Sequence, residues 1–321
     1  MTNDVILRSR VRIARNIKDY PFPPALNETC RKEIIEKVSA AAADFQTDTS
    51  LLNKIDALAL FEENLISKEF ATEKELHSLL FNKESQTYIM VCEEDHLRIQ
   101  SFADGLNLEK AGKAALDCER MLSEKISFAF NGELGYLTRC PTNLGTAMRA
   151  SVMMFLPALT MLNRMGEIKT ELEKIGITIR GMYGEGSAAD AYLYQISNRL
   201  SLGLTEEDIL RKTETIAKKI AEDERNARAS LFENNKDKLT DKIMRSLGIL
   251  KFAHILSSKE FLDSYAYVRL GIALGLIERI DNIDSLLYEA MPAHIMKMYG
   301  EAANKPNERD KFRAKLVNKL L

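Results

Sequence analysis

The feature that most constrains the fold of this chain is a change of pattern at Thr205. Before it, apolar stretches with strand-like alternation are separated by helical stretches and by turns. From Thr205 the sequence has the form of a helix N-cap followed by an acidic first turn, and residues 206–321 carry an almost continuous helical pattern. Strands mixed with helices, followed by helices alone, indicate an α+β first domain and an all-helical second domain.

Local periodicity places the elements of the first domain. Helical spacing of apolar residues predicts helices over 28–47, 107–130, a segment that runs through Met148 to Leu156, and 162–174. Alternation predicts strands over 54–61, 87–92, 97–102, 134–139, 176–183 and 192–200. The domain boundary is placed near residue 233, which divides the chain into 1–233 and 234–321. No Gly/Ser-rich linker marks the boundary, so the two domains are expected to pack tightly.

Composition argues against several classes of partner. Hydrophobic residues make up 45% and charged residues 29% of the 321 residues, which is typical of a soluble globular protein. The net charge of −2 provides no overall attraction to nucleic acid, so no direct nucleic-acid partner is expected. No apolar run approaches the roughly 20 residues that span a bilayer, and the first residues do not have the form of a signal peptide. No membrane partner is therefore expected.

The cysteines and histidines show no disulfide or metal-binding pattern. The four cysteines lack CxxC spacing, which favours a reducing cytoplasm over a disulfide framework or a structural zinc site. The four histidines are far apart and lack ligand spacing. The sequence therefore predicts a cytoplasmic protein with no protein-bound metal.

Arginines recur at positions that a fold could bring together. Arg10 and Arg12 alternate, so on a strand their side chains face the same side. Arg98 follows an acidic turn, and Arg149 follows a turn that contains Gly145. A planar guanidinium group grips phosphate oxygens with two parallel hydrogen bonds, so several arginines together suit a polyphosphate. An Arg-x-Arg pair taken alone is more often a solvated basic edge.

Two further segments carry candidate catalytic groups. Glu94 is the centre of a run of carboxylates, residues 93–95, between two apolar stretches. Such a run is usually a solvated turn, but a carboxylate at the mouth of a cleft can orient a guanidinium group and accept its proton. Cys140 begins the segment CPTNLGT. A lone cysteine is more often a buried, inert side chain than a reactive thiol.

Two longer segments, EEDHLRIQ (93–100) and GYLTRCPTNLGTAMRASVMM (135–154), are specific. With them the chain resembles the ATP:guanido phosphotransferases (phosphagen kinases), and within that family the bacterial branch of McsB-type protein-arginine kinases. The resemblance runs from Asp4 to Leu321. It implies a catalytic domain with an antiparallel sheet flanked by helices, and a helical domain for dimerisation and phosphoarginine binding. It also implies that the protein uses ATP with Mg²⁺, the ion being held largely by phosphates and water.

The resemblance assigns a role to each candidate residue. It implies that Glu94 orients the substrate guanidinium group and accepts its proton, and that Cys140 is a reactive thiol beside that group. It implies that the nucleotide phosphates are bound by four arginines: Arg10, Arg12, Arg98 and Arg149. These cations would neutralise the charge that spreads over the transferring phosphoryl group.

One loop departs from the family pattern. The relatives read Gly-Glu-Gly-Ser-Glu-Ala where this chain reads GEGSAA (184–189), so Ala188 replaces a second catalytic glutamate. Glu185 matches a retained glutamate that is not catalytic, and Asp190 would substitute only if the loop shifted. Tyr183 stands where phosphagen kinases have an arginine, as it does in the protein-arginine kinase branch. Loss of a positioned base typically costs about 10²–10⁴-fold in rate, so Ala188 predicts a less efficient enzyme.

The C-terminal segment PNERDKFRA (306–314) carries a second motif of the same family. Taken alone it is the charged end of an amphipathic helix. It matches the Arg-Asp-x-x-Arg-Ala motif of the protein-arginine kinases, which implies phosphoarginine binding by Arg309, Asp310 and Arg313. Arg309 and Arg313 are four residues apart, so they share a helix face and could both approach a phosphate.

The resemblance implies a cytoplasmic kinase that phosphorylates arginine side chains of proteins, among them a heat-shock repressor, and marks them for degradation by Clp protease. A zinc-finger activator protein and a second copy of the chain, in a homodimer, are the other implied partners. One alternative is a weak or inactive homologue that only binds phosphoarginine proteins, which Ala188 favours and the intact arginine set disfavours. The other is a kinase for free arginine, which the C-terminal motif disfavours.

Overall fold

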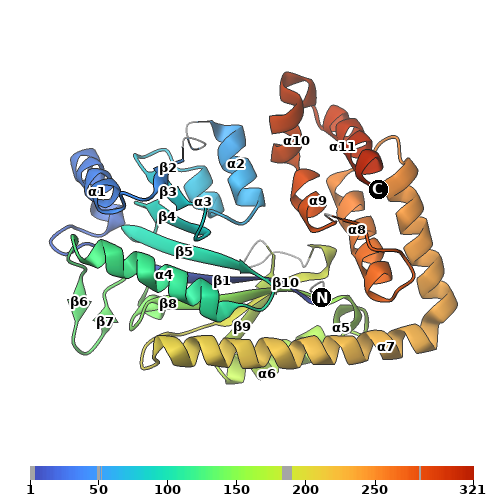
Figure 1. The fold of residues 1–321 in the computed structure, drawn as a ribbon, viewed down its shortest axis with the longest axis horizontal. Helices are drawn as coiled ribbons and strands as arrows, with labels where there is room; N and C mark the ends of the chain where they lie inside the picture. Colours follow the sequence, from blue (N-terminus) through green and yellow to red (C-terminus); the bar gives the residue numbers. More distant parts are fainter. Residues whose placement is uncertain (1–3, 49–50, 52, 183–189, 282) are drawn as a thin grey trace.

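The centre of the molecule is an antiparallel sheet (Figure 1). The computed structural model describes residues 4–48, 51, 53–182, 190–281 and 283–321. In the sheet the strand order is β2-β3-β4-β5-β1-β8-β10-β9. The strands are β1 (Ile6–Arg15), β2 (Gln46–Thr47), β3 (Ser78–Asn82), β4 (Thr87–Val91), β5 (Leu97–Asp104), β8 (Met148–Phe155), β9 (Ile177–Gly181) and β10 (Leu193–Asn198). A separate small hairpin pairs β6 (Phe130–Asn131) with β7 (Gly135–Tyr136).

Helices flank the sheet and then form the C-terminal region. The first group is α1 (Glu28–Ala41), α2 (Lys54–Glu62), α3 (Lys68–Ala71), α4 (Leu108–Ser123), α5 (Pro157–Met161) and α6 (Met165–Lys174). The second group is α7 (Glu206–Phe252), α8 (Ser258–Ala273), α9 (Ile283–Glu289), α10 (Pro292–Tyr299) and α11 (Pro306–Leu320). Figure 1 shows the long α7 passing along the sheet and then turning toward the cluster of α8 to α11. The predicted α+β architecture, followed by a helical region, is confirmed.

Alternation along β1 gives the sheet two different faces. Val11 and Ile13 are fully buried on the face that packs against α4. Arg10 and Arg12 point to the opposite face, because successive side chains of a strand alternate. The predicted strands over 87–92, 97–102, 176–183 and 192–200 correspond to β4, β5, β9 and β10. The sequence pattern therefore predicts most of the strands near the candidate site.

Two predicted elements are wrong. The segment 54–61 is the helix α2 rather than a strand. The side chain of Asn53 caps this helix by accepting a hydrogen bond from Ile55 N, and the Ala, Leu and Lys residues that follow are strong helix formers. The segment from Met148 to Leu156 contains the strand β8 rather than a helix. This strand lies between β1 and β10 and is buried almost throughout, and a continuous buried strand lacks the alternation that marks an exposed one. The predicted strand 134–139 shortens to β7.

The helix α7 joins the sheet region to the C-terminal helices. Its backbone departs from helical geometry at Asn235 (φ −137°, ψ 28°), close to the domain boundary predicted near residue 233. The first part of α7 contributes Ile209 and Ile220 to the core under the sheet, and the last part contributes Ile243 to a second core. That second core also contains Phe155 of β8, so the C-terminal helices pack directly on the sheet region. None of the helices in the described part of the chain is long and apolar enough to cross a membrane.

A cluster of side chains joins α2 to α10. The carboxylate of Glu62, at the end of α2, accepts hydrogen bonds from the backbone N–H groups of Ala293 (2.8 Å) and His294 (3.2 Å) at the start of α10. The His294 ring lies between two carboxylates, with Nδ1 3.0 Å from Glu62 and Nε2 2.8 Å from Glu63. Both ring nitrogens therefore act as donors, which requires the imidazolium form.

We expect this contact to weaken at high pH. Burial alone would lower the pKa of His294, but the hydrogen bonds to Glu62 and Glu63 outweigh burial and raise the pKa to about 9, from an ordinary value of 6.5. The folded state thus binds the proton more tightly than the unfolded state, and the stabilisation is complete below pH 6.5 and lost as pH rises through about 9. The melting temperature of the wild type should exceed that of His294→Gln at pH 6.5, and the difference should shrink at pH 9.5.

The exposed His254 provides the control for this measurement. The melting temperature of His254→Gln should match that of the wild type at both pH values. If the difference in melting temperature between the wild type and His294→Gln stays constant with pH, an imidazolium bridge is contradicted.

Candidate functional site

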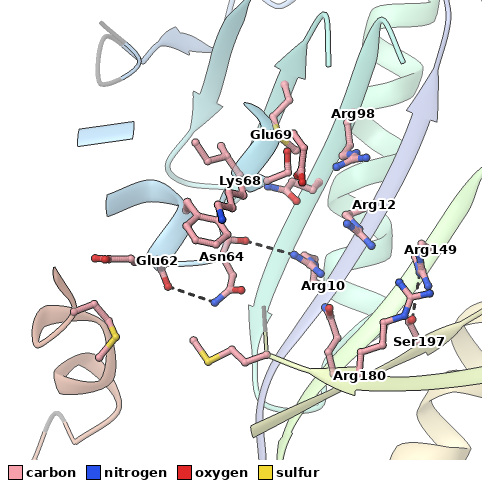
Figure 2. A pocket seen from close by; sticks show the side chains of 18 of the residues that line it. Arg10, Arg12, Glu62, Asn64, Lys68, Glu69, Arg98, Arg149, Arg180 and Ser197 are labelled. Atoms are coloured by element: carbon pink, nitrogen blue, oxygen red, sulfur yellow. Dashed lines mark hydrogen bonds between the residues drawn. The ribbon is translucent and has the colours of Figure 1, made fainter. Parts of the chain in front are cut away.

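Five arginines line one cavity on the face of the sheet opposite α4. The cavity has a volume of about 760 Å³ and lies between the sheet and the α2–α3 segment. Its arginines are Arg10, Arg12, Arg98, Arg149 and Arg180. Figure 2 shows Arg10, Arg12 and Arg98 in a row along neighbouring strands, with Arg149 and Arg180 beside them and Lys68 and Glu69 across the cavity. All four arginines predicted to bind phosphate thus meet in one space.

The register of the sheet explains this convergence. Arg12 on β1 is opposite Arg149 on β8 and opposite Gln100 on β5. Arg98 is two positions from Gln100 on the same strand and therefore shares its face. Arg149 Nε donates to Ser197 Oγ of β10 (3.2 Å), which holds its side chain over the sheet. Residues far apart in the sequence are brought together by antiparallel pairing.

The arginines destabilise one another's charge. Burial, followed by the charges of Arg98, Arg8 and Arg149, lowers the pKa of Arg10 to about 9. Burial and the neighbouring guanidinium groups also hold the pKa of Arg12 well below its ordinary value. The guanidinium groups in this cavity therefore repel one another. A polyanion that entered it would relieve this repulsion and would be bound strongly.

An acidic cavity adjoins the arginine cavity. It has a volume of about 570 Å³, and its lining includes Glu93, Glu94, Arg98 and Cys140. Arg98 forms ion pairs of 2.9 Å with Glu93 and of 2.9 Å with Glu94, so it belongs to both cavities. A third space of about 430 Å³ is lined by Glu94 and Cys140 together with Arg12, Arg98 and Arg149. The structure therefore places the candidate carboxylate and thiol beside the candidate phosphate-binding groups.

Short elements fix the walls of these cavities. Ser67 caps α3 by accepting a hydrogen bond from Phe70 N (3.1 Å), and its hydroxyl donates to Glu93 Oε1 (2.7 Å). Cys140 lies at the start of a 3-10 turn, Pro141–Asn143, and its Sγ is 3.0 Å from Thr142 Oγ1. The Arg10 guanidinium donates to Asn64 O at 3.4 Å, a contact that is visible in Figure 2.

Sequence reasoning missed Arg180. It lies on β9 opposite Gln195 of β10 and lines two of the cavities that hold the other arginines. The available signal was a lone arginine in the apolar stretch ITIRG (177–181), shortly before the loop 184–189 that departs from the family pattern. The loop residues Tyr183, Glu185 and Ala188 lie outside the described residues, and Asp190 begins a short 3-10 turn after them.

The C-terminal residues Arg309 and Arg313 differ in exposure and in hydrogen-bond partners. Arg313 is 1% exposed, and its guanidinium group donates to Ala290 O (2.6 Å), Leu256 O (2.8 Å) and the Asp310 carboxylate (2.5 Å). Arg309 is more accessible and donates to Asn304 O at 2.8 Å. Arg313 therefore ties α11 to the connections between α7 and α8 and between α9 and α10, and a phosphate ligand would meet Arg309 first. In the described ranges, no group of three or more His, Cys, Asp and Glu side chains could hold a metal ion.

Comparisons with known proteins match both the sheet region and the helical region of the chain. The family model described as ATP:guanido phosphotransferase, C-terminal catalytic domain, matches residues 26–227, and the one described as protein-arginine kinase McsB C-terminal domain matches 236–321. A protein-arginine kinase of Caldanaerobacter subterraneus subsp. tengcongensis is 40% identical over 99% of this chain and 97% of its own length. One of Clostridium acetobutylicum is 39% identical over 95% of this chain and 93% of its own length.

Solved structures show the same fold. A lombricine kinase matches with a TM-score of 0.61 at 24% identity, covering 72% of this chain and 69% of that chain. A duplicated taurocyamine kinase from Schistosoma mansoni with bound transition state analog components matches with a TM-score of 0.62 at 23% identity, over 86% of this chain and 47% of its own. The sequence matches extend through both the sheet region and the helical region, and the chain therefore belongs to the ATP:guanido phosphotransferase family, with the C-terminal domain of its McsB-type protein-arginine kinases.

Proposed function

We propose that this protein transfers the γ-phosphoryl group of ATP to arginine side chains of proteins. The observation that carries the proposal is the contact between two kinds of site: a cavity lined by five arginines, and an acidic cavity that contains Glu94 and Cys140, joined through Arg98. The arginine cavity suits a nucleoside triphosphate, and the acidic cavity suits a guanidinium group.

In this reaction the residues have complementary tasks. Arg10, Arg12, Arg98 and Arg149 hold the phosphates and balance the charge of the transferring group. A guanidinium nitrogen attacks the γ-phosphorus, an N–P bond forms, and the bond from phosphorus to the bridging oxygen of ADP breaks. Glu94 accepts the proton that the guanidinium group loses. Mg²⁺ enters with ATP, held by phosphates and water.

The substrate class follows from the helical region. The match of residues 236–321 to the C-terminal domain of protein-arginine kinases supports arginine in proteins rather than free arginine as the substrate. The proposal extends to a cytoplasmic homodimer, to a heat-shock repressor among the substrates, to Clp protease as the consumer of the product, and to a zinc-finger activator. These partners rest on family resemblance.

A direct assay tests the proposed activity. The protein is incubated with MgATP and an arginine-rich protein, and the products are analysed by mass spectrometry under conditions that preserve acid-labile phosphoarginine. Free arginine is offered in a parallel reaction. Phosphoarginine on the protein supports the proposal, phosphorylation of free arginine alone points to a phosphagen kinase, and no product from either contradicts a kinase function.

We also propose that α11 binds phosphoarginine through Arg309 and Asp310, separately from catalysis. A charge-assisted hydrogen bond contributes roughly 1.5–3 kcal/mol, so Arg309→Ala with Asp310→Asn should lower phosphoarginine affinity more than tenfold. Asn is chosen at position 310 because it keeps an acceptor for the buried Arg313. ATP affinity should not change, and Lys311→Ala is the control. Equal phosphoarginine affinity in the wild type and the double variant would contradict this role.

A further inference from the structure

We propose that Asn16 and Asp95 are positioning residues for phosphoryl transfer, which hold the turn that carries Glu94 and the turn that carries Cys140 at a fixed separation. The inference rests on the proposed function, because it assigns these two turns to the guanidinium substrate. It concerns side chains that do not line the cavities and that would act only through their neighbours.

The buried carboxylate of Asp95 connects the two turns directly. Asp95 follows Glu94 in the chain and is 2% exposed. Its Oδ1 accepts a hydrogen bond of 2.8 Å from the backbone N–H of Arg139, the residue before Cys140. The same oxygen accepts a hydrogen bond of 2.6 Å from Asn16 Nδ2. One oxygen atom therefore links the residue after the candidate base to the residue before the candidate thiol.

Asn16 provides the support for this link. It follows the end of β1 and is 1% exposed. Its Nδ2 also donates to Leu137 O (3.0 Å), and its Oδ1 accepts from His96 N (2.8 Å). The amide thus contacts the Cys140 side through Leu137 and the Glu94 side through Asp95 and His96. Because its oxygen faces a donor and its nitrogen faces two acceptors, its orientation is fixed.

His96 holds the outer end of this network. It is fully buried, its Nδ1 accepts from Ile17 N (2.9 Å), and its Nε2 is 2.8 Å from Pro21 O. Since Nδ1 faces a donor and Nε2 faces an acceptor, the ring is the neutral tautomer with hydrogen on Nε2. The backbone bond from Cys92 N to His96 O (2.8 Å) closes the turn that contains Glu94. Hydrogen bonds of His96 and of the turn around Glu94 therefore hold Asn16 and Asp95 in place.

The separation of the two turns matters because the guanidinium group must lie between them. Glu94 and Cys140 line the same two cavities, so their relative position determines where a substrate nitrogen sits relative to the γ-phosphate. In-line transfer tolerates little displacement, and an error of about 1 Å can reduce a rate 10²-fold. The phosphate-binding arginines lie on β1, β5 and β8, whose backbone pairing does not depend on this link. Loss of the link should therefore reduce kcat and leave nucleotide binding unchanged.

The test compares Asp95→Ala with Asp95→Asn. Asn keeps an oxygen that accepts from both Arg139 N and Asn16, whereas Ala removes it. We expect Asp95→Ala to lower kcat at least about 100-fold, with the KM for MgATP within about threefold of the wild type. The kcat of Asp95→Asn should be at least about tenfold higher than that of Asp95→Ala. A kcat within about threefold of the wild type in Asp95→Ala, or equal losses in the Ala and Asn variants, would overturn the proposal.

Calorimetric binding of ATP shows whether Asp95→Ala has folded. If it has not, the decision rests on two variants of nearly unchanged size, Asp95→Asn and Asn16→Asp. Asn16→Asp places a carboxylate oxygen against Asp95 Oδ1 and Leu137 O, so it should lose kcat while Asp95→Asn stays active. Equal activity in these two variants would overturn the proposal. If Glu94→Gln retains full activity, the proposed catalytic site is wrong, and the result does not bear on the positioning role of Asn16 and Asp95.

Discussion

Glu94→Gln is expected to lower the kcat for arginine phosphorylation by about 10²–10⁴-fold, the loss that follows removal of a positioned general base. Gln has nearly the same size as Glu but cannot accept the proton of the guanidinium group. The side chain of Glu94 is 35% exposed and lines a cavity together with Cys140, while Arg98 holds one of its carboxylate oxygens at 2.9 Å. The remaining oxygen is available to a substrate.

The measurement is phosphoarginine formation by mass spectrometry, together with ATP affinity by calorimetry. ATP affinity should remain within about threefold of the wild type, because Gln still accepts a hydrogen bond from Arg98. Glu84→Gln is a matched control, since Glu84 is exposed in the turn between β3 and β4, away from the cavities. If Glu94→Gln is as active as the Glu84→Gln control, another group accepts the proton.

Local alternation was sufficient to predict that Arg10 and Arg12 share a face, and the apolar stretches around residues 93–95 were sufficient to predict β4 and β5. The register was not predictable. That Arg12 lies opposite Arg149 depends on pairing between β1 and β8, and nothing in either segment specifies a partner. The set of candidate residues came from family resemblance, and the structure supplies the reason that they converge.

The errors have separate physical causes. Residues 54–61 alternate in hydrophobicity, but an N-cap at Asn53 and intrinsic helix propensity prevail over that pattern. Residues 148–155 are buried almost throughout, so their pattern does not distinguish a strand from a helix. The burial of Arg313 was not predictable from its helical spacing to Arg309, because the carbonyl groups of Leu256 and Ala290 that accept its hydrogen bonds come from other parts of the fold. Burial of a long polar side chain depends on neighbours that are distant in sequence.

The second large effect concerns the arginine cavity, where one substitution should change two properties in opposite directions. Arg12→Met keeps the length of the side chain and removes its charge. Affinity for MgATP should fall at least tenfold, about 1.4 kcal/mol, because a charged partner of the phosphates is lost. Inorganic tripolyphosphate should lose affinity to a similar extent, since both ligands use the same phosphate contacts. Calorimetry at constant ionic strength measures both losses.

The ligand-free protein, in contrast, should become more stable. Burial and the charges of Arg10, Arg98 and Arg149 lower the pKa of Arg12, which means that its cationic form is held unfavourably in the folded state. Removing that charge should raise the melting temperature without ligand, and added ATP should then raise it less than in the wild type. Arg120→Met is the control, because Arg120 is 73% exposed and pairs with Asp117 on the surface of α4. Unchanged ATP affinity in Arg12→Met would contradict a phosphate-binding role for this cavity, whereas reduced affinity with reduced ligand-free stability would show that Arg12 supports the fold as well as the ligand.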